Sequence, residues 1–141
     1  MRAMFDLAMH YGEGPISIKT VAERQDLSEH YLEQLIAALK KAGLVNSVRG
    51  AQGGYELALP PEQIKIGDII RALEGPIAPV ECVESDDPDA RNCERYEGCA
   101  ARVLWRKLRD SMIHVLDSTS LRDLCDEAVN LQSERALMYN I

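Results

Sequence analysis

The sequence predicts a mainly α protein: a winged helix-turn-helix domain with a two-stranded wing, followed by a long dimerisation helix. Three observations lead to this prediction. Two short amphipathic segments, each preceded by a serine, are separated by a tight turn. A glycine-rich stretch, VRGAQGGY at 48–55, lies between two short apolar runs. A later segment, 100–117, carries one continuous apolar stripe at helical spacing.

The first predicted helices follow from apolar spacing and from capping residues. Residues 1–11 place apolar side chains on one helix face, namely Met4, Leu7, Ala8 and Tyr11. This helix stops at the breaker sequence GEGP, 12–15. Ser17 caps a second helix over 18–25, and Ser28 caps a third that ends before Gly43. The expected inward face of the third helix is Tyr31, Leu32, Leu35, Ile36 and Leu39.

The wing and a fourth helix complete the expected N-terminal part. Residues 44–48 and 55–59 predict two strands, and the glycine-rich stretch between them predicts a hairpin loop. Two prolines at 60–61 close the wing, and a short helix over 66–73 stops at the Gly-Pro pair at 75–76. We therefore expect a winged helix-turn-helix domain over 1–75.

The C-terminal half divides into a loop and two helices. Residues 76–98 contain three prolines, seven acids and only two arginines, so we expect a loop that needs something to order it. The helix over 100–117 has the apolar stripe Ala101, Leu104, Trp105, Leu108, Met112, Val115 and Leu116. A copy of the same stripe in a homodimer would bury it most economically. A last helix, capped by Ser120, is expected over 121–132. The predicted parts are a cysteine-containing sensor loop, 76–99, and the dimerisation and C-terminal helices, 100–141.

Composition bounds the location and the class of protein. The chain has 141 residues and no apolar run of about 18 or more, so no membrane span is expected. The first residues include Asp6 and lack the apolar stretch of a signal peptide, which makes a cytoplasmic location the default. No serine–histidine–acid set, phosphate-binding glycine loop or HExxH motif is visible, so an enzyme is not expected.

Charge distribution and residue types predict binding to double-stranded DNA. The net charge of −7 argues against a purely electrostatic nucleic-acid binder, yet 34–55 contains three basic residues and no acid. Candidate base-reading residues on the third helix are Ser28, His30, Tyr31, Glu33 and Gln34. Lys40 and Lys41 are candidates for phosphate contacts, and Arg49 for entry into a minor groove. Close backbone approach is expected at Gly50, Gly53 and Gly54. The alternative is an ordinary hairpin with a solvated arginine.

Four cysteines raise the question of a metal or redox site. Cys82, Cys93 and Cys99 are separated by ten and five residues, without the CxxC pairs of structural zinc sites. Thiolates are soft ligands for zinc, Cu(I) or an iron–sulfur cluster, and free thiols or an incidental disulfide are the alternatives. The candidates for a fourth ligand are His10, His30 and His114. Cys125 lies among apolar residues of the last helix and is expected to be a buried core thiol.

Residues 2–76 as a whole resemble the Rrf2 family of bacterial transcription regulators, and SEHYLEQLIAALKKAGLVNSVRGAQGGY, 28–55, is the most specific part. The resemblance implies a homodimeric winged-helix protein that binds a DNA operator. It places recognition positions at Ser28, Tyr31, Glu33 and Gln34 and wing positions at Arg49, Gly50, Gly53 and Gly54. It is strongest to the iron–sulfur regulators of the IscR type, which implies a cluster, 2Fe–2S rather than 4Fe–4S, on Cys82, Cys93 and Cys99.

The sequence departs from that pattern in three ways. Arg102 stands three residues after the third cysteine, where IscR-type members have a ligating histidine. The first cysteine gap is longer than usual, and the chain begins inside the first helix, without the short preceding segment of other members. We expect a repressor, switched by its cluster, of iron–sulfur biogenesis or redox and nitrosative stress genes. The alternative is a cluster-free regulator of cysteine metabolism that responds to thiol oxidation or to a protein partner.

Overall fold

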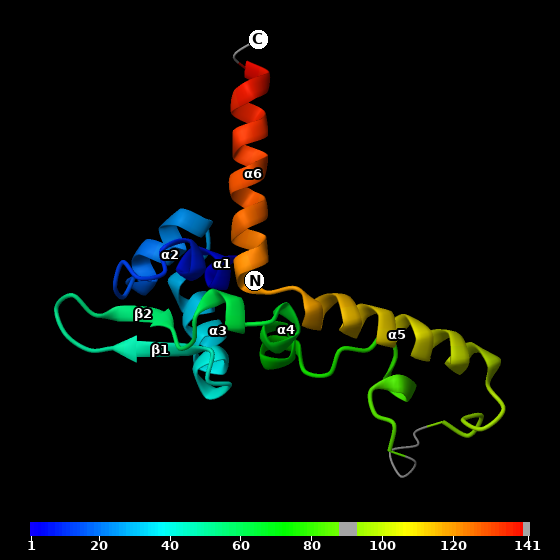
Figure 1. Ribbon diagram of the computed structural model, residues 1–141. Helices are drawn as coiled ribbons and strands as arrows, with labels where there is room; N and C mark the ends of the chain where they lie inside the picture. The colour runs from blue at the N-terminus through cyan, green and yellow to red at the C-terminus, as the bar shows by residue number, and fades with distance from the viewer. Residues whose placement is uncertain (88–92, 140–141) are drawn as a thin grey trace.

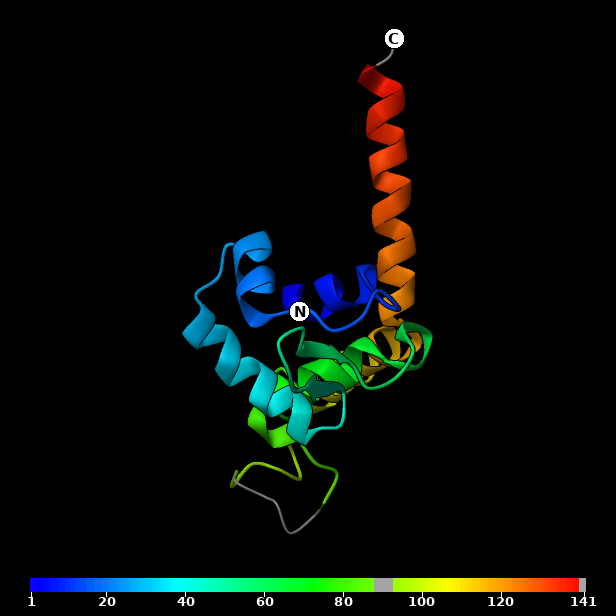
Figure 2. The ribbon, with the colours of Figure 1, turned by 90° about the vertical axis from the view of Figure 1, so that its left-hand side faces the viewer.

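The computed structural model describes residues 1–87 and 93–139. Its elements follow the chain in an order that matches the predicted fold class: α1 (Arg2–Met9), α2 (Ile18–Gln25), α3 (Glu29–Lys41), β1 (Val45–Val48), β2 (Gly54–Leu57), η1 (Pro61–Gln63), α4 (Ile66–Glu74), η2 (Glu81–Val83), α5 (Ala100–Ser118) and α6 (Leu121–Tyr139). The elements α1 to α4 and the hairpin gather on one side, and α5 extends away from them (Figure 1). Helix α6 rises from the junction and projects alone for most of its length (Figures 1 and 2).

An aliphatic core holds the N-terminal elements together. Its fully buried members come from α1, α3, the strand β1, the segment before α4, α4 itself and the start of α6: Met4, Leu32, Leu39, Val45, Ile64, Ile69 and Leu121. Cys125, one turn further along α6, is also buried, as the sequence predicted, and burial raises the pKa of its thiol. The first turns of α6 therefore belong to the same core as the winged helix.

The sheet is the two-stranded antiparallel hairpin that the sequence predicted. Val45 pairs with Leu57 at its base and Val48 pairs with Gly54 near its tip. The hairpin is also attached to the loop between α1 and α2, because Ile16 and Tyr55 exchange two backbone hydrogen bonds of 2.9 and 2.8 Å. A Cβ atom at Gly54 would lie 2.3 Å from the Ile16 carbonyl oxygen, so only glycine permits this approach.

Several element boundaries differ from the sequence predictions. Helix α1 ends at Met9, leaving Tyr11 half exposed, and α6 continues to Tyr139 instead of ending at 132. Tyr31 was expected on the inward face of α3, but 51% of its surface is exposed, because Leu32 and Ile36 fill that face. Among the described residues, no helix combines the length and apolarity that a membrane-spanning segment needs.

The predicted apolar stripe of α5 is present but mostly uncovered within one chain. Leu104 and Val115 are 61% and 59% exposed, and Leu108 and Met112 are also exposed. Leu116, near the end of the helix, packs against the core, and Arg109 is the buried residue of α5. The stripe therefore needs a partner outside the described chain to be buried.

Candidate nucleic-acid interface and cysteine segment

Helix α3 presents the predicted base-reading residues on one exposed face. Its N-cap is Ser28, whose Oγ accepts a hydrogen bond of 3.2 Å from the Tyr31 backbone N–H. The preceding turn contains Asp26 in the left-handed conformation, with φ of 52°. With the opposite face packed into the core, the structure leaves the whole predicted set exposed, Ser28, His30, Tyr31, Glu33 and Gln34. Their contacts with bases stay a prediction.

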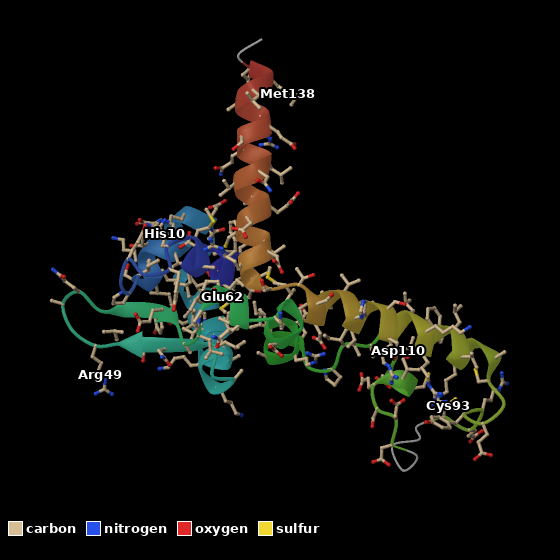
Figure 3. The ribbon with its side chains drawn as sticks, viewed as in Figure 1. His10, Arg49, Glu62, Cys93, Asp110 and Met138 are labelled. Carbon is tan, nitrogen blue, oxygen red and sulfur yellow. The ribbon has the colours of Figure 1, made fainter. Side chains whose placement is uncertain are left out.

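The wing carries one arginine at an exposed tip. Arg49 directly follows β1, and its side chain points away from the hairpin into solvent (Figure 3). The loop then turns back on itself at Gly50, with φ of +123°, and Gly53, whose N–H donates to the Gly50 carbonyl. A Cβ atom at Gly53 would lie 2.2 Å from the Val48 carbonyl oxygen. Gly50 and Gly53 thus allow the tight loop that exposes Arg49.

The two predicted phosphate-contacting lysines lie at the end of α3. Lys40 donates a 2.8 Å hydrogen bond from Nζ to Ser47 Oγ on β1, which ties the end of the helix to the wing. Lys41 is exposed. Their positive charges also suit the C-terminal end of the helix, where the backbone carbonyls concentrate negative charge.

A buried carboxylate that the sequence analysis did not single out fixes α2 against α1. Asp6 is only 4% exposed and accepts hydrogen bonds from Arg24 Nη1 at 3.2 Å and Gln25 Nε2 at 3.1 Å. His10, one turn after Asp6, bonds the Asp6 backbone carbonyl through Nδ1 at 2.9 Å. This polar cluster positions the first helix of the helix-turn-helix. An acid among the apolar residues of α1 was the signal available in the sequence.

The structure separates the three cysteines of the sensor loop by environment. Cys82 is half-buried in η2, Cys93 is exposed, and Cys99 is half-buried at the N-cap of α5. Cys93 and Cys99 line one open cavity of about 660 Å³, and Cys82 does not line it. Within 1–87 and 93–139, no three histidine, cysteine or acidic side chains are arranged to hold a metal ion. His10 lies on the opposite side of the molecule from Cys93 (Figure 3).

Arg102 joins the two described parts of the cysteine segment, 76–99, namely η2 and the turn over 93–99. Its Nε donates a 3.3 Å hydrogen bond to the Cys82 carbonyl oxygen, and one terminal nitrogen donates to the Tyr96 hydroxyl. Its guanidinium carbon also lies 3.7 Å from the centroid of the Tyr96 ring. The side chain that stands at the expected fourth-ligand position is therefore engaged with η2 and with the 93–99 turn.

Arg109 attaches the beginning of the loop to α5. Its Nη1 donates to the Val83 carbonyl at 2.8 Å and to Asp86 Oδ1 at 3.1 Å, while Nη2 donates to Asp86 Oδ2 at 3.2 Å. The hydrogen bonds from Arg109 lower the pKa of the Asp86 carboxyl group. Asp110 accepts a further bond from Arg109. The sequence analysis missed this anchor because an arginine beside an apolar stripe usually indicates a solvated helix face.

A third arginine connects the other end of α5 to the winged helix. Arg71 of α4 forms a bidentate pair with Asp117, with both N–O distances 2.8 Å. The pair lowers the pKa of the Asp117 carboxyl group. A Cβ atom at Gly67 would lie 1.9 Å from Asp117 Oδ1, so the glycine makes room for this carboxylate. Contacts thus run from the cysteine segment along α5 to the domain that carries α3.

Comparison with known proteins decides the family. The model of the Rrf2 family, described as iron-dependent transcriptional regulators, matches residues 1–127. The chain belongs to the Rrf2 family. It is therefore a DNA-binding transcription regulator and not an enzyme. This agrees with the resemblance carried by residues 28–55.

Relatives within the Rrf2 family include both CymR and IscR proteins. CymR of Bacillus subtilis is 52% identical over 121 residues, which cover 86% of this chain and 80% of CymR. IscR of Aliivibrio salmonicida is 40% identical over 134 residues, covering 94% of this chain and 77% of that protein. Of these two relatives, CymR has the higher identity, so the expected resemblance to the IscR type is confirmed only in part.

Solved structures of Rrf2 proteins have the same fold. The structure of CymR (YrzC), "the Global Cysteine Regulator of B. subtilis", gives a TM-score of 0.71 at 51% identity and covers 88% of both chains. The structure of T. potens IscR gives a TM-score of 0.73 at 51% identity, covering 90% of this chain and 80% of that one. These likenesses confirm the winged helix-turn-helix with its two-stranded wing and long C-terminal helices.

The side chains that could act as ligands show whether this Rrf2 protein fits an iron–sulfur cluster. Such clusters are generally held by four protein ligands, usually cysteine thiolates or histidines. The cysteine segment supplies three thiols, and the fourth position holds Arg102, which carries no lone pair for a metal and is hydrogen-bonded elsewhere. Cys93 and Cys99 line one cavity, and Cys82 does not line it. The described residues therefore do not fit a complete cluster site.

Proposed function

We propose that the chain is a homodimeric, cluster-free regulator of cysteine-metabolism genes. Its operator binding responds to thiol oxidation or to a partner protein at residues 76–99. The observation that carries the proposal is Arg102, which replaces a fourth ligand and bonds the Cys82 carbonyl and Tyr96 instead. The 52% identity to CymR supports the link to cysteine metabolism, since CymR of B. subtilis is described as a global cysteine regulator.

Operator reading is assigned to the exposed face of α3 and to the wing. Glu33 can accept a hydrogen bond from a cytosine amino group, and Gln34 can form a bidentate pair with adenine. Arg49 reaches a minor groove, where the negative potential is strongest when the groove is narrow. Lys40 and Lys41 supply charge toward phosphates. Residues 1–75 thus read DNA, 76–99 receive the signal, and 100–141 join the two subunits.

The dimer is proposed from the uncovered stripe of α5. Its successive exposed members lie about one turn apart along one helix, and an identical stripe from a second copy would cover them: Leu104, Leu108, Met112 and Val115. Replacing Leu104 by glutamate should shift the protein to monomer in sedimentation experiments. A variant of Lys107, which lies off the stripe, should remain dimeric.

A second candidate function keeps the iron–sulfur cluster as the sensor. It is favoured by the three cysteines near the start of α5 and by the 51% identity to T. potens IscR. Under this candidate a 2Fe–2S centre binds Cys82, Cys93 and Cys99, with a fourth ligand that the described residues do not supply. The genes controlled would then be those of iron–sulfur biogenesis or of redox and nitrosative stress.

Anaerobic purification separates the two candidates. The full chain is purified without oxygen, and iron and acid-labile sulfide are assayed per chain before and after cluster reconstitution. Operator affinity is measured in parallel on DNA selected by the protein from a random library. We expect colourless protein with intact DNA binding. Brown protein with stoichiometric sulfide, lost when Cys82, Cys93 or Cys99 becomes alanine, would favour the cluster and contradict the proposal.

A further inference from the structure

The 93–99 segment folds back so that its two end residues face one cavity. The Tyr96 N–H donates to the Cys93 carbonyl at 3.2 Å, and the Gly98 N–H donates to the Arg95 carbonyl at 3.3 Å. These two successive turns place Cys93 and Cys99 at the lining of the open 660 Å³ cavity, together with the five residues between them. Figure 3 shows Cys93 beside the outer end of α5, away from the winged helix.

The two thiols differ from the other two cysteines of the chain. Cys125 is buried in the core, and Cys82 is held in η2 outside the cavity. Cys93 is exposed, and Cys99 is the N-cap of a 19-residue helix with no side-chain hydrogen bond at its cap. An accessible thiol therefore shares a solvent-open site with a second, half-buried thiol at the start of α5.

We infer that Cys93 and Cys99 are a dithiol site that a hydroperoxide converts into an intrachain disulfide, and that this bond lowers operator affinity. The inference rests on the proposed function and names the thiol signal within it. One thiolate attacks the terminal peroxide oxygen, which breaks the O–O bond and gives a sulfenic acid. The leaving alkoxide, or hydroxide from hydrogen peroxide, takes up the thiol proton and departs as an alcohol or as water. The second thiolate attacks the sulfenic sulfur, and the displaced hydroxide leaves as water with the second thiol proton. The two thiols are oxidised by two electrons, and the peroxide is reduced.

A disulfide between Cys93 and Cys99 would close a short ring and act directly on the contacts of Arg102. Tyr96 lies inside the ring, and its hydroxyl and its aromatic face both contact the Arg102 guanidinium. The same guanidinium bonds the Cys82 carbonyl of η2. Reshaping the turn moves Tyr96, so the link between the 93–99 turn and η2 is altered at the start of α5. The Arg71–Asp117 pair connects the other end of α5 to the winged helix.

The tryptic map of the chain makes the test unambiguous. Each of the four cysteines falls on a different peptide, namely 72–91, 92–95, 96–102 and 123–135 for Cys82, Cys93, Cys99 and Cys125. The reduced full-length protein is treated with hydrogen peroxide, blocked with iodoacetamide, denatured and digested. We expect peptides 92–95 and 96–102 joined with the loss of two hydrogen atoms and separated by a reductant. The variant Cys82→Ser should give the same pair.

Operator affinity of the same samples supplies the second readout. Oxidised wild-type protein and Cys82→Ser should bind about tenfold more weakly than when reduced. Cys93→Ser and Cys99→Ser should not respond to peroxide treatment. A link from Cys82 to either cysteine, oxidation of single thiols without a link, or a link without change in affinity would overturn the inference. Failure of the reduced protein to bind any selected DNA would instead contradict the proposed function.

Discussion

The wing and the 93–99 turn are both short reversals of the chain that contain glycine, yet they are held in different ways. The wing is fixed by backbone groups, through the β1–β2 ladder and the double hydrogen bond between Ile16 and Tyr55. The 93–99 turn is held to the rest of the chain largely through side chains, above all Arg102. A backbone-locked loop keeps a preset shape for reading DNA, whereas a loop held by side chains changes when a few contacts change.

The largest expected effect tests the backbone lock of the wing. In Gly54→Ala the new Cβ would lie 2.3 Å from the Ile16 carbonyl oxygen and 2.8 Å from the Ser17 nitrogen. Because neither backbone atom can yield cheaply, we expect the free energy of unfolding to fall by about 3 kcal/mol, measured by urea denaturation. The matched control is Gly98→Ala in the cysteine segment, where no atom lies within 4 Å of the added Cβ. If both substitutions lowered the free energy of unfolding by the same amount, the wing would not differ from the 93–99 turn in how tightly its backbone is held.

The next effect concerns the function of the wing rather than its stability. Arg49→Ala removes the one charge at the hairpin tip and should weaken operator binding about tenfold, or about 1.4 kcal/mol. Its unfolding midpoint should not change, because Arg49 is exposed and makes no described contact with the core. Binding is measured by titration at fixed salt, with Lys107→Ala as the charge-matched control on α5. Unchanged operator affinity of Arg49→Ala would show that Arg49 does not contribute to DNA binding.

The same contrast explains which parts of the structure could be predicted from the sequence. The helices around the core follow from apolar periodicity with serine caps, as at Ser17 and Ser28, and the hairpin follows from its glycines. These signals are local, so they can be recognised along the chain. The exposed reading face of α3 was predicted for the same reason, although Tyr31 was assigned to both faces.

The arrangement of the cysteine segment depended on contacts that no local pattern predicts. Arg109 and Asp86 are 23 residues apart, and Arg71 and Asp117 are 46 apart. Which arginine pairs with which acid depends on the path of α5, and many charges of both signs were available. The additional turns of α6 to Tyr139 also carried no clear signal, because its apolar residues do not form one stripe.

A smaller effect is expected where the two regions are joined, at Asp117. Asp117→Asn removes the charge of the bidentate pair with Arg71 and should cost about 1 kcal/mol at neutral pH. The hydrogen bond from Arg71 lowers the pKa of Asp117 in the folded protein. Its stabilising contribution is therefore complete above the unfolded-state value of about 3.9 and is lost as pH falls through the lower, folded-state pKa.

The pH dependence gives the measurement for this pair. The difference in unfolding free energy between wild type and Asp117→Asn should shrink as the pH is lowered below about 4. Asp126→Asn provides a control, because Asp126 pairs with Arg122 on the exposed surface of α6, where such pairs contribute little. A difference independent of pH would assign the effect to packing against Gly67 instead of to charge.

A small effect on stability should accompany a clear local change at Arg102. Arg102→Ala removes the hydrogen bonds to the Cys82 carbonyl and to Tyr96, but it touches no member of the apolar core. We expect the free energy of unfolding to change by less than about 0.5 kcal/mol, while alkylation of Cys82, followed on peptide 72–91, becomes several-fold faster. Arg106→Ala, one turn further along α5, should leave the alkylation rate unchanged. A fall in global stability as large as that of Gly54→Ala would mean that the cysteine segment unfolds together with the winged helix. The segment would then be a structural part of the winged-helix domain. A change in the contacts of the segment could not alter the segment without also destabilising that domain.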